Sequence, residues 1–481
     1  MLFLITLSGE IPLKSRISRN RLLRILVRNI RDALERNGYS EPRFRIVDAK
    51  ILVEINGDAL EILSRVFGIH KVSSVSKIVF RDLSELVEKI VPKYIDLVRD
   101  RKFAVRVKRT GKHSFTSMDV EREVGAKLKP YSAGVDLENP DIEVKLEIYG
   151  NEAYLIEKDL KGPGGLPLGS EGSALTLFSG GFDSPVAAWL TAKRGVYIDF
   201  LHLYMGSAGS TYNAFLVAKK LVEKWLFGYK PRFILIDFSE VVKSILEKIE
   251  HRYRQVVLRS LMYITAEKIA SKMGYKAIVT GESIGQASSQ TLRNLTAIEV
   301  ATELHIPILR PLLGFDKEEI IGISRKLGLY ELSSRVAEVC ILARRGVVTS
   351  TKPTVIKELI AQFSNEISKA IDSVRIYDII STDPSSIIES MVEIDFIPEN
   401  SVLIDVRERN KFISDKLPGA IHISDVDSEM KSKLIDKNLV FYCDSGYLSS
   451  IVAKEFRKFG YRAFSISRNT ALKCLRNRLS G

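Results

Sequence analysis

The chain has 481 residues, of which 45% are hydrophobic and 27% are charged, and its formal net charge is +13. This composition is typical of a globular protein with about three or four domains, and it excludes a disordered or fibrous chain. No apolar run approaches the roughly 18 residues that a membrane-spanning helix needs, so no membrane partner is expected. The excess of positive charge favours a polyanionic partner, nucleic acid before any other.

The three cysteines, Cys340, Cys443 and Cys474, are too few and too scattered for the disulfide framework of a secreted domain. The first seven residues lack the basic start and the cleavage site of a signal peptide. No Cys-x-x-Cys pair occurs and the histidines form no cluster, so a zinc or iron–sulfur site is not expected. These observations predict a cytoplasmic protein whose thiols are reduced at rest.

The N-terminal segment predicts a small β-α-β-β-α module. Residues 1–7 alternate as a strand does, and apolar residues at helical spacing predict a helix over 17–36. A hairpin and a second helix follow, an order that suits a ferredoxin-like fold. The polar side of the first helix is either a solvated face or a phosphate-binding surface, and the sequence leaves both open. This row of basic side chains comprises Arg19, Arg21, Arg24, Arg28 and Arg31.

A helix over 83–98 precedes the most basic predicted strand of the chain. Residues 101–113 read Arg-Lys-Phe-Ala-Val-Arg-Val-Lys-Arg-Thr-Gly-Lys-His, and no acidic residue follows until after Met118. Strand alternation turns Phe103, Val105 and Val107 toward a core. Together with Asp-Leu-x-Asn-Pro-Asp at 136–141, this run resembles the THUMP domain of RNA-modifying enzymes. The resemblance implies binding to the acceptor end of tRNA, through Arg106, Lys108, Arg109, Lys112 and His113.

Residues 162–169 are too rich in glycine and proline for regular structure and predict a linker. The pattern then becomes βαβα, which predicts a parallel sheet with helices on both faces. The expected strands cover 174–178, 197–204, 232–237 and 277–280. Ligands of such sheets bind at the carboxyl ends of the strands, so the loops that follow these strands should converge.

The loop after the first of these strands, Ser179–Ser184, reads Ser-Gly-Gly-Phe-Asp-Ser. With Ser184 as N-cap and Pro185 at the first helical position, it joins a strand end to a helix start and forms an anion site. It lacks the ending of the Walker loop and the spacing of the dinucleotide fingerprint. It resembles instead the pyrophosphatase loop of ATP-dependent adenylating enzymes. That resemblance implies that the loop holds pyrophosphate and that Asp183 assists Mg²⁺ binding or adenylyl transfer.

A second polar loop follows the strand at 277–280 and reads Thr-Gly-Glu-Ser-Ile-Gly-Gln-Ala-Ser-Ser-Gln-Thr over 280–291. It occupies the position of the second ATP-contacting loop of the pyrophosphatase-loop fold. Arg259, on the preceding helix, is either a phosphate counter-ion or a surface cation. Lys317 begins a helix capped by Asp316, where a cation is electrostatically unfavourable, so a reach toward phosphate or substrate is plausible.

The C-terminal segment predicts a compact α/β unit, and its runs at 402–408, 417–423 and 439–449 resemble a rhodanese domain. Cys443 lies in a loop that opens a helix, where backbone N–H groups stabilise a thiolate or a persulfide anion. The loop carries Asp444 and no cation, so this stabilisation is expected to rest on the backbone alone. The sequence around Cys340 alone predicts a small buried residue, and the sequence around Cys474 predicts a structural one.

Four modules in this order resemble the tRNA 4-thiouridine synthetase (tRNA uridine 4-sulfurtransferase) family. The resemblance implies an α/β multidomain protein with α+β N-terminal modules. These are a ferredoxin-like domain over 1–60 and a THUMP domain over 61–165. A doubly wound parallel-sheet pyrophosphatase-loop ATPase core over 172–375 and an α/β rhodanese-like domain over 386–481 follow. The implied activity is the ATP-dependent replacement of O4 of uridine 8 of tRNA by sulfur.

The resemblance also implies roles for individual residues. ATP and Mg²⁺ adenylate the uridine, with Lys317 offsetting the developing charge and Asp183 holding the metal through the nucleotide. Cys443 accepts a persulfide from a cysteine desulfurase or another donor, Cys340 closes on it as a disulfide, and a cellular reductant resets the pair. The implied ATP contacts are Leu177, Phe178, Ser179, Gly180, Gly181, Asp183, Ser184, Arg259, Gly281 and Gln290.

Three other functions remain open at this stage. The first is another ATP-pyrophosphatase ligase or amidotransferase acting on RNA, which would need a glutamine-hydrolysing domain that the sequence does not show. The second is a sulfur carrier in thiamine thiazole synthesis, which would need only Cys443, and the third is a noncatalytic tRNA-binding protein. The sequence leaves the sulfur donor, the place of the rhodanese-like unit and the oligomeric state open, a homodimer included.

Overall fold

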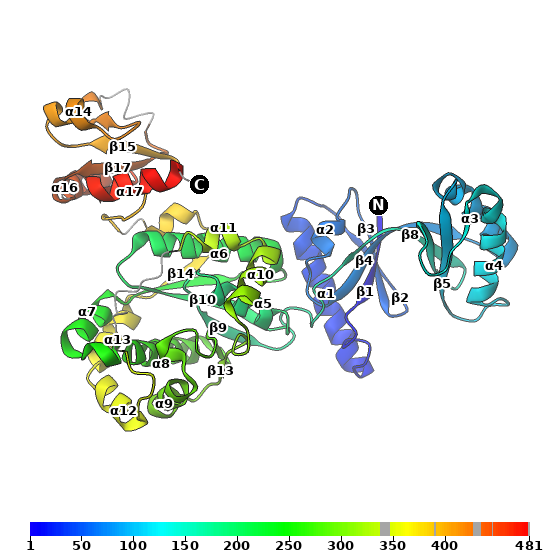
Figure 1. Ribbon diagram of the computed structural model, residues 1–481, viewed down its shortest axis with the longest axis horizontal. Helices are drawn as coiled ribbons and strands as arrows, with labels where there is room; N and C mark the ends of the chain where they lie inside the picture. The colour runs from blue at the N-terminus through cyan, green and yellow to red at the C-terminus, as the bar shows by residue number, and fades with distance from the viewer. Residues whose placement is uncertain (337–346, 389–390, 427–433, 445, 480–481) are drawn as a thin grey trace. The chain divides into compact units, whose positions relative to one another are not determined.

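Figure 1 shows the computed structural model, which describes residues 1–336, 347–388, 391–426, 434–444 and 446–479. The chain divides into two compact units. The first comprises Met1–Glu171 with the short segments Ala192–Val196 and Trp225–Tyr229, and the second comprises the rest. Within the described ranges, no helix has both the length and the apolar character needed to cross a membrane.

The first unit is built on one eight-stranded sheet in the order β2-β3-β1-β4-β8-β7-β5-β6. The antiparallel pair β4–β8 joins the predicted ferredoxin-like strands to the predicted THUMP strands. Neither β4 nor β8 is predicted by the residue patterns. The strands are β1 (Leu2–Leu7), β2 (Arg43–Val47), β3 (Lys50–Glu54), β4 (Ile69–Val79), β5 (Lys102–Thr110), β6 (Gly134–Val135), β7 (Ile142–Tyr149) and β8 (Glu152–Lys161).

Four helices pack on this sheet: α1 (Arg16–Arg36), α2 (Leu60–Leu63), α3 (Leu83–Val98) and α4 (Ser117–Leu128). Alternate residues of β1 separate the two faces of the sheet. Phe3 and Ile5 join the core under α1, whereas Leu4 joins a small apolar cluster on the opposite face. In β5, Phe103 and Val105 are buried against α3 and α4, as the alternation predicts.

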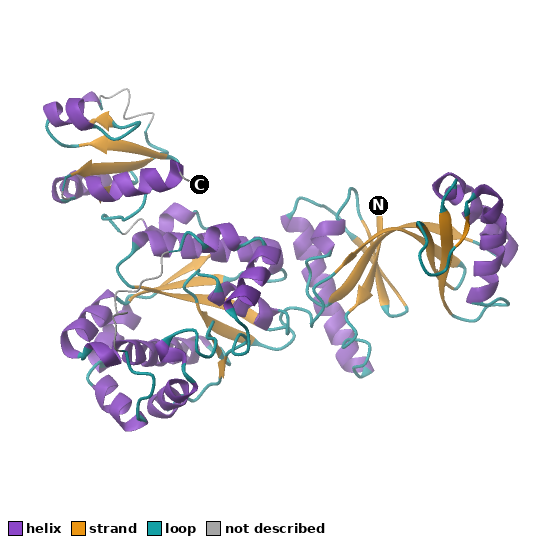
Figure 2. Cartoon of the chain, viewed as in Figure 1, coloured by secondary structure: helices purple, strands orange, loops and turns teal. Residues whose placement is uncertain are grey.

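The second unit contains a six-stranded sheet in the order β13-β12-β9-β10-β11-β14. All neighbours are parallel except β14, which runs antiparallel to β11. α5 and α6 lie on one side of this sheet and α7 and α8 on the other (Figures 1 and 2), which confirms the predicted doubly wound core. The strands are β9 (Ser173–Leu177), β10 (Tyr197–Tyr204), β11 (Arg232–Asp237), β12 (Ile278–Val279), β13 (Ile308–Leu309) and β14 (Arg375–Asp378).

The strand order positions the site. The chain builds outward from β9 through β10 to β11 and then returns to place β12 on the other side of β9. The carboxyl ends of β9 and β12 therefore flank a topological switch point, where ligands of open α/β sheets bind. The helices of this part are α5 (Asp183–Ala192), α6 (Ala208–Trp225), α7 (Ser239–Lys248), α8 (Arg254–Met273), α9 (Leu292–Thr302), α10 (Lys317–Leu327), α11 (Tyr330–Ser333), α12 (Pro353–Ala361) and α13 (Ser364–Asp372).

One local expectation is wrong at the start of α5. The helix begins at Asp183, two residues before the predicted first position Pro185. The hydroxyl of Ser184 does not serve as the N-cap. It turns back into the loop and accepts hydrogen bonds from the N–H groups of Ser179 and Gly180, each at 3.2 Å. Two amides with no partner in the sheet are satisfied in this way.

The last part of the chain forms a parallel four-stranded sheet in the order β16-β15-β17-β18. The central strand β17 ends at Cys443, and the helix that follows begins at Tyr447, two residues earlier than expected. The elements are β15 (Ser401–Asp405), α14 (Arg409–Asp415), β16 (Ile421–His422), β17 (Asn438–Cys443), α16 (Tyr447–Lys458), β18 (Ala463–Ser467) and α17 (Arg468–Leu479).

Candidate active site

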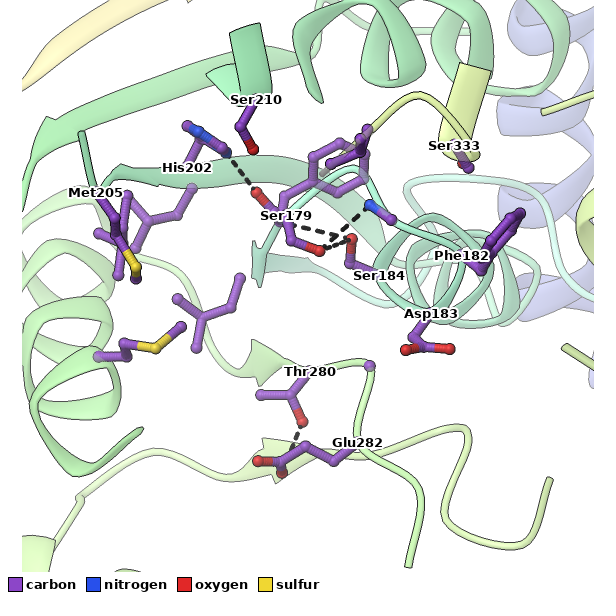
Figure 3. Close-up of a pocket in the computed structure, with 18 of the residues that line it drawn as sticks. Ser179, Phe182, Asp183, Ser184, His202, Met205, Ser210, Thr280, Glu282 and Ser333 are labelled. Atoms are coloured by element: carbon purple, nitrogen blue, oxygen red, sulfur yellow. Dashed lines mark hydrogen bonds between the residues drawn. The ribbon is translucent and has the colours of Figure 1, made fainter. Parts of the chain in front are cut away.

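A cavity of about 500 Å³ opens at the switch point, between the loop that follows β9 and the loop that follows β12 (Figure 3). This volume is within the range of small-molecule sites. Three of the four loops that were expected to converge contribute to the lining of this cavity, those after β9, β10 and β12, whereas Asp237 after β11 lines a separate pocket. Most of the predicted ATP contacts line the cavity, together with Lys317: Leu177, Phe178, Ser179, Gly181, Asp183, Ser184, Arg259, Gly281 and Gln290.

Gly180 is required by the backbone of the loop and by its packing against α6. Its φ is +83°, and a Cβ atom there would lie 2.5 Å from the Cα atom of Ala214 on α6. Only glycine fits both the left-handed backbone and this close approach. Gly180 therefore lets the loop pack against α6, and the amides of Ser179 and Gly180 converge on one oxygen, that of Ser184. Both amides are thus engaged within the loop.

Asp183 and Lys317 both line the cavity and form an ion pair with each other. Lys317 Nζ lies 2.9 Å from Asp183 Oδ1, and Gln286 Nε2 donates to Asp183 Oδ2 at 3.0 Å. The Lys317 ammonium also lies 5.6 Å from the centre of the Phe182 ring. The carboxylate is thus held by the second loop and by the start of α10, and it stays about a quarter exposed, at 26%.

Arg259 lines the cavity, and both of its terminal nitrogens are already engaged, whereas its buried Nε atom has no hydrogen-bond partner among the described residues. Its Nη1 atom bonds to Glu282 and its Nη2 atom donates to Ser289 at 3.3 Å. Through these contacts it joins α8 to the second loop rather than standing free as a phosphate counter-ion.

Apart from Met205, which follows the predicted strand 197–204, the apolar lining of the cavity and one histidine were not predicted. Leu201, Leu203, Met205 and Met262 contribute apolar side chains to the lining, which suit a flat ring. His202, between the two leucines on β10, is 5% exposed. Burial lowers the pKa of His202 to about 4, so the ring is neutral and its Nδ1–H donates to the carbonyl of Phe178. The end position on a predicted central strand could have indicated this residue.

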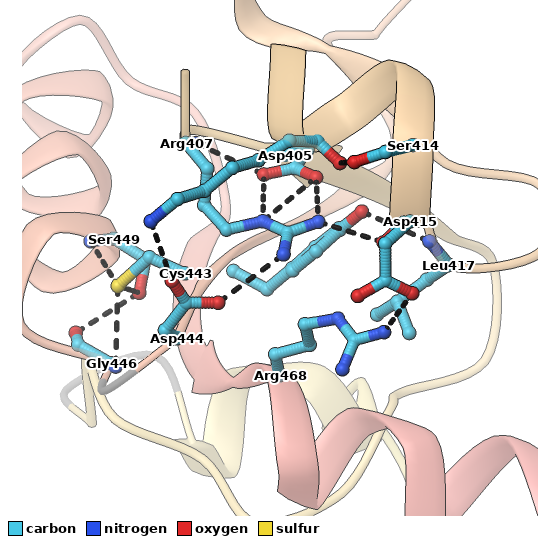
Figure 4. A network of polar contacts seen from close by, with 12 residues as sticks. Asp405, Arg407, Ser414, Asp415, Leu417, Cys443, Asp444, Gly446, Ser449 and Arg468 are labelled. Carbon is cyan, nitrogen blue, oxygen red and sulfur yellow. Dashed lines mark hydrogen bonds and ion pairs between the residues drawn. The ribbon is translucent and has the colours of Figure 1, made fainter. Parts of the chain in front are cut away.

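Cys443 is 5% exposed at the end of β17. Its Sγ atom accepts hydrogen bonds from the N–H groups of Gly446 at 3.2 Å and Ser449 at 3.4 Å, and it lies 3.4 Å from the Ser449 hydroxyl (Figure 4). Burial opposes the thiolate, but the hydroxyl and the amides together lower the pKa of Cys443. The expectation of backbone stabilisation alone is therefore incomplete, because a side-chain donor at Ser449 contributes.

The charge of Asp444, next to the thiol, is compensated by residues outside the loop. Arg407 Nη1 donates to Asp444 at 3.2 Å, and Lys411 Nζ does so at 3.3 Å (Figure 4). Arg407 is itself held by the fully buried Asp405, with Nη2 and Oδ2 2.7 Å apart. Although burial opposes its charge, Lys411 and Arg407 lower the pKa of Asp444. The carboxylate beside Cys443 is therefore neutralised by two cations that the loop sequence does not reveal.

The remaining cysteines are Cys340 and Cys474. Cys340 lies outside the described residues. Cys474, on α17, is half-buried, and its thiol donates to the carbonyl of Asp395 at 3.4 Å. Among the residues that the structure describes, no group of three or more His, Cys, Asp or Glu side chains could hold a metal ion.

The predicted RNA contacts lie on β5 and the turn after it. Lys108 and Lys112 are exposed, whereas Arg106 pairs with Glu143 at 3.5 Å. His113 links the turn to the neighbouring hairpin, because its Nδ1 lies 2.7 Å from Arg109 Nη1 and its Nε2 lies 2.7 Å from the carbonyl of Gly150. His113 thus positions Arg109 as well as contributing a side chain to the surface.

The arginine row of α1 is largely exposed, as both a solvated helix face and a phosphate-binding surface require. Arg21, Arg24, Arg28 and Arg31 are exposed at helical spacing and Arg19 is half-buried. Arg31 also lies 5.4 Å from the centre of the Phe44 ring. The geometry leaves the choice between a solvated face and a phosphate surface open.

Four protein-family models match successive parts of the chain. They are the ThiI ferredoxin-like domain over 3–73, the THUMP domain over 79–156, the thiamine biosynthesis protein ThiI over 169–366 and the rhodanese-like domain over 394–468. Among solved structures, a 4-thiouridine synthetase in an RNA complex with bound ATP matches with a TM-score of 0.68 and 27% identity. That match covers 78% of this chain and 98% of that one.

Three curated relatives match almost the whole chain. A tRNA sulfurtransferase of Desulfurococcus amylolyticus is 54% identical and covers 96% of each chain. One of Thermoplasma acidophilum is 37% identical over 98% of this chain and 96% of its own. One of Pyrobaculum aerophilum is 35% identical over 96% and 95%. With its four modules and these relatives, the chain belongs to the tRNA sulfurtransferase family.

Proposed function

We propose that this enzyme uses ATP to replace O4 of uridine 8 of tRNA by sulfur, giving 4-thiouridine. The observation that carries the proposal is the meeting of Asp183, Lys317 and the Ser179–Ser184 loop at one cavity. The solved relative, titled a 4-thiouridine synthetase in complex with RNA and ATP, supports the choice of substrate. The basic strand β5 on the first unit supports a nucleic-acid partner.

Activation is the first chemical requirement, because the carbonyl oxygen of uridine is a poor leaving group. In the proposed step O4 attacks the α-phosphorus of ATP, and pyrophosphate leaves toward the Ser179–Ser184 loop. Lys317 offsets the charge that develops on the phosphates. The pocket fits the nucleotide, since its lining combines apolar side chains with two polar loops. Mg²⁺ bound with ATP supplies Lewis-acid stabilisation, and Asp183 is the residue that would hold it.

Sulfur transfer is the second step. Cys443 receives a sulfur atom from a cysteine desulfurase or another persulfide donor, and its lowered pKa favours the anionic form that this requires. The terminal sulfur attacks C4 and AMP leaves. The thiolate of Cys340 then attacks Sγ of Cys443, which forms a disulfide and frees the product sulfur. A two-electron reductant restores both thiols. An order in which Cys340 first frees hydrosulfide balances equally well.

The test uses the full-length protein with tRNA, ATP and Mg²⁺ but without a sulfur donor. We expect pyrophosphate release that depends on tRNA and that falls at least about tenfold in Asp183→Asn. Release that is independent of tRNA, or equal in the Asp183→Asn protein, would overturn the adenylation step.

The name of the matching family model, thiamine biosynthesis protein, favours a second role as a sulfur carrier for thiazole synthesis. This role needs Cys443 but not the nucleotide cavity. Sulfur delivery to an acceptor other than tRNA that survives Asp183→Asn and is lost in Cys443→Ser would establish it.

A further inference from the structure

Glu282 is a buried acidic residue in the wall of the nucleotide cavity. It follows β12 in the second loop and is 2% exposed. Its Oε1 atom accepts from Arg259 Nη1 and from the hydroxyl of Tyr263, both on α8. Its Oε2 atom accepts from Thr280 Oγ1 at 3.0 Å and from Arg310 Nε at 2.6 Å. The carboxylate thus ties its own loop to α8 and to the end of β13.

The electrostatics of this cluster indicate an anchor rather than an anion site. Burial alone would raise the pKa of Glu282, but Arg259, Tyr263 and Arg310 together lower it, so the carboxylate stays ionised. Arg310 also pairs with Glu299. Two arginines are therefore matched by two carboxylates, and the cluster has no excess charge to offer a phosphate.

The segment that Glu282 anchors touches Asp183 at two points. A Cβ atom on Gly281 would lie 2.8 Å from the carbonyl carbon of Asp183, so the backbones of the two loops are in close contact. Further along the same loop, Gln286 donates to the Asp183 carboxylate at 3.0 Å. Figure 3 shows Thr280 and Glu282 on the side of the cavity that Asp183 faces.

We propose that Glu282 is a positioning residue for Asp183: it fixes the second loop so that Gly281 and Gln286 hold Asp183 at the start of α5. The inference rests on the proposed adenylation, in which Asp183 acts at the reacting phosphates. Loosening the loop lets Asp183 shift, and a misplacement on the order of 1 Å near the reacting atoms costs up to about 100-fold in rate.

The test measures kcat and KM for ATP in tRNA-dependent pyrophosphate release. Glu282→Gln is expected to lower kcat about 10-fold to 100-fold, with a smaller change in KM. Glu282→Gln removes the negative charge that Arg259 and Arg310 share, which can destabilise the fold. A milder variant is therefore measured as well. Thr280→Val removes one hydrogen-bond donor and keeps both ion pairs, and we expect a smaller fall in kcat in the same direction.

Glu299→Gln is the matched control. It removes a carboxylate from the same Arg310, but its side chain is 48% exposed and lies outside the loop, so kcat should stay within about twofold of wild type. The Gln286→Leu background gives a second readout. If Glu282 acts through the loop, the fold-loss from Thr280→Val is smaller in that background, whereas a merely structural role gives the same fold-loss in both.

The outcomes separate the two proposals. Absence of tRNA-dependent pyrophosphate release in wild type would overturn the proposed function itself. Normal release in wild type with an unchanged kcat in Thr280→Val, or with equal fold-losses in both backgrounds, would overturn the positioning role of Glu282 and leave the proposed function standing.

Discussion

Lys317 Nζ lies 2.9 Å from Asp183 Oδ1, although 134 residues separate them in the chain. Lys317 is the first residue of α10, an end of the helix that disfavours a cation. The Asp316 capping box and Asp183 offset that cost. Both side chains remain partly exposed, at 39% and 26%. An ion pair of this exposure contributes about 0–1 kcal/mol, so it can open when a nucleotide enters.

Lys317→Met should therefore separate activity from stability. We expect tRNA-dependent pyrophosphate release to fall by about 100-fold or more, since the proposed mechanism places this charge at the reacting phosphates. The free energy of unfolding should change by no more than about 1 kcal/mol. Denaturant unfolding and a pyrophosphate assay on the same preparation check both, and a large loss of stability with unchanged kcat would show that the pair is structural.

Cys443→Ser should abolish formation of 4-thiouridine and leave tRNA-dependent pyrophosphate release near the wild-type rate. The reason is that, in the proposed mechanism, the thiol enters only after adenylation. Cys474→Ser is the matched control, because this thiol bonds to a backbone carbonyl outside the loop of Cys443. Loss of both activities in a folded Cys443→Ser protein would contradict this division of labour.

The pKa of Cys443 gives a prediction about pH. Alkylation requires the thiolate, whose fraction rises as pH rises through the pKa, so a lowered pKa moves the onset of reaction to lower pH. Ser449→Ala removes one donor to the sulfur, which should raise the pKa and move the onset to higher pH. Iodoacetamide labelling of Cys443, followed by peptide mass spectrometry across a pH series, measures this. An identical profile in both proteins would show that the amides suffice.

The basic strand is tested by salt dependence. Lys108→Gln with Arg109→Gln should weaken tRNA binding and reduce the slope of log K against log salt, by roughly 0.7–0.9 for each phosphate that is no longer neutralised. The matched control is Arg81→Gln with Lys89→Gln, because these two cations of the same unit are already paired with Glu85. Equal slopes in the test and control variants would remove β5 from the RNA interface.

A row of four exposed arginines on α1 invites the same experiment. Replacing Arg24 and Arg28 by glutamine keeps good helix formers at both positions. If the row binds phosphates, the salt slope should fall by a similar amount for each phosphate. An unchanged affinity and slope would identify the row as a solvated helix face.

Sequence reasoning found the cavity because its two loops carry distinctive motifs and follow strands whose ends converge. It missed β4 and β8, where charged and serine side chains interrupt the apolar alternation of the strands. It also expected the hydroxyl of Ser184 to cap α5, because the tightness of the loop is not visible in the residue types. Local patterns do not reveal which amides need an acceptor.

Long-range partners account for the rest of what was missed. The motif identified Arg259 as a cation near the nucleotide, but Glu282 pairs with it across 23 residues. The loop of Cys443 contains no cation in its sequence, but Arg407, 37 residues away in the chain, donates to Asp444. Such pairings depend on tertiary packing, which spacing along the chain does not encode.

The most direct test of the central claim is nucleoside mass spectrometry of tRNA after incubation with the wild-type protein, ATP, Mg²⁺ and a persulfide donor. The account predicts 4-thiouridine at position 8, dependent on ATP and absent with either Asp183→Asn or Cys443→Ser. Thiouridine formed without ATP, or formed equally by the Asp183→Asn protein, would contradict it.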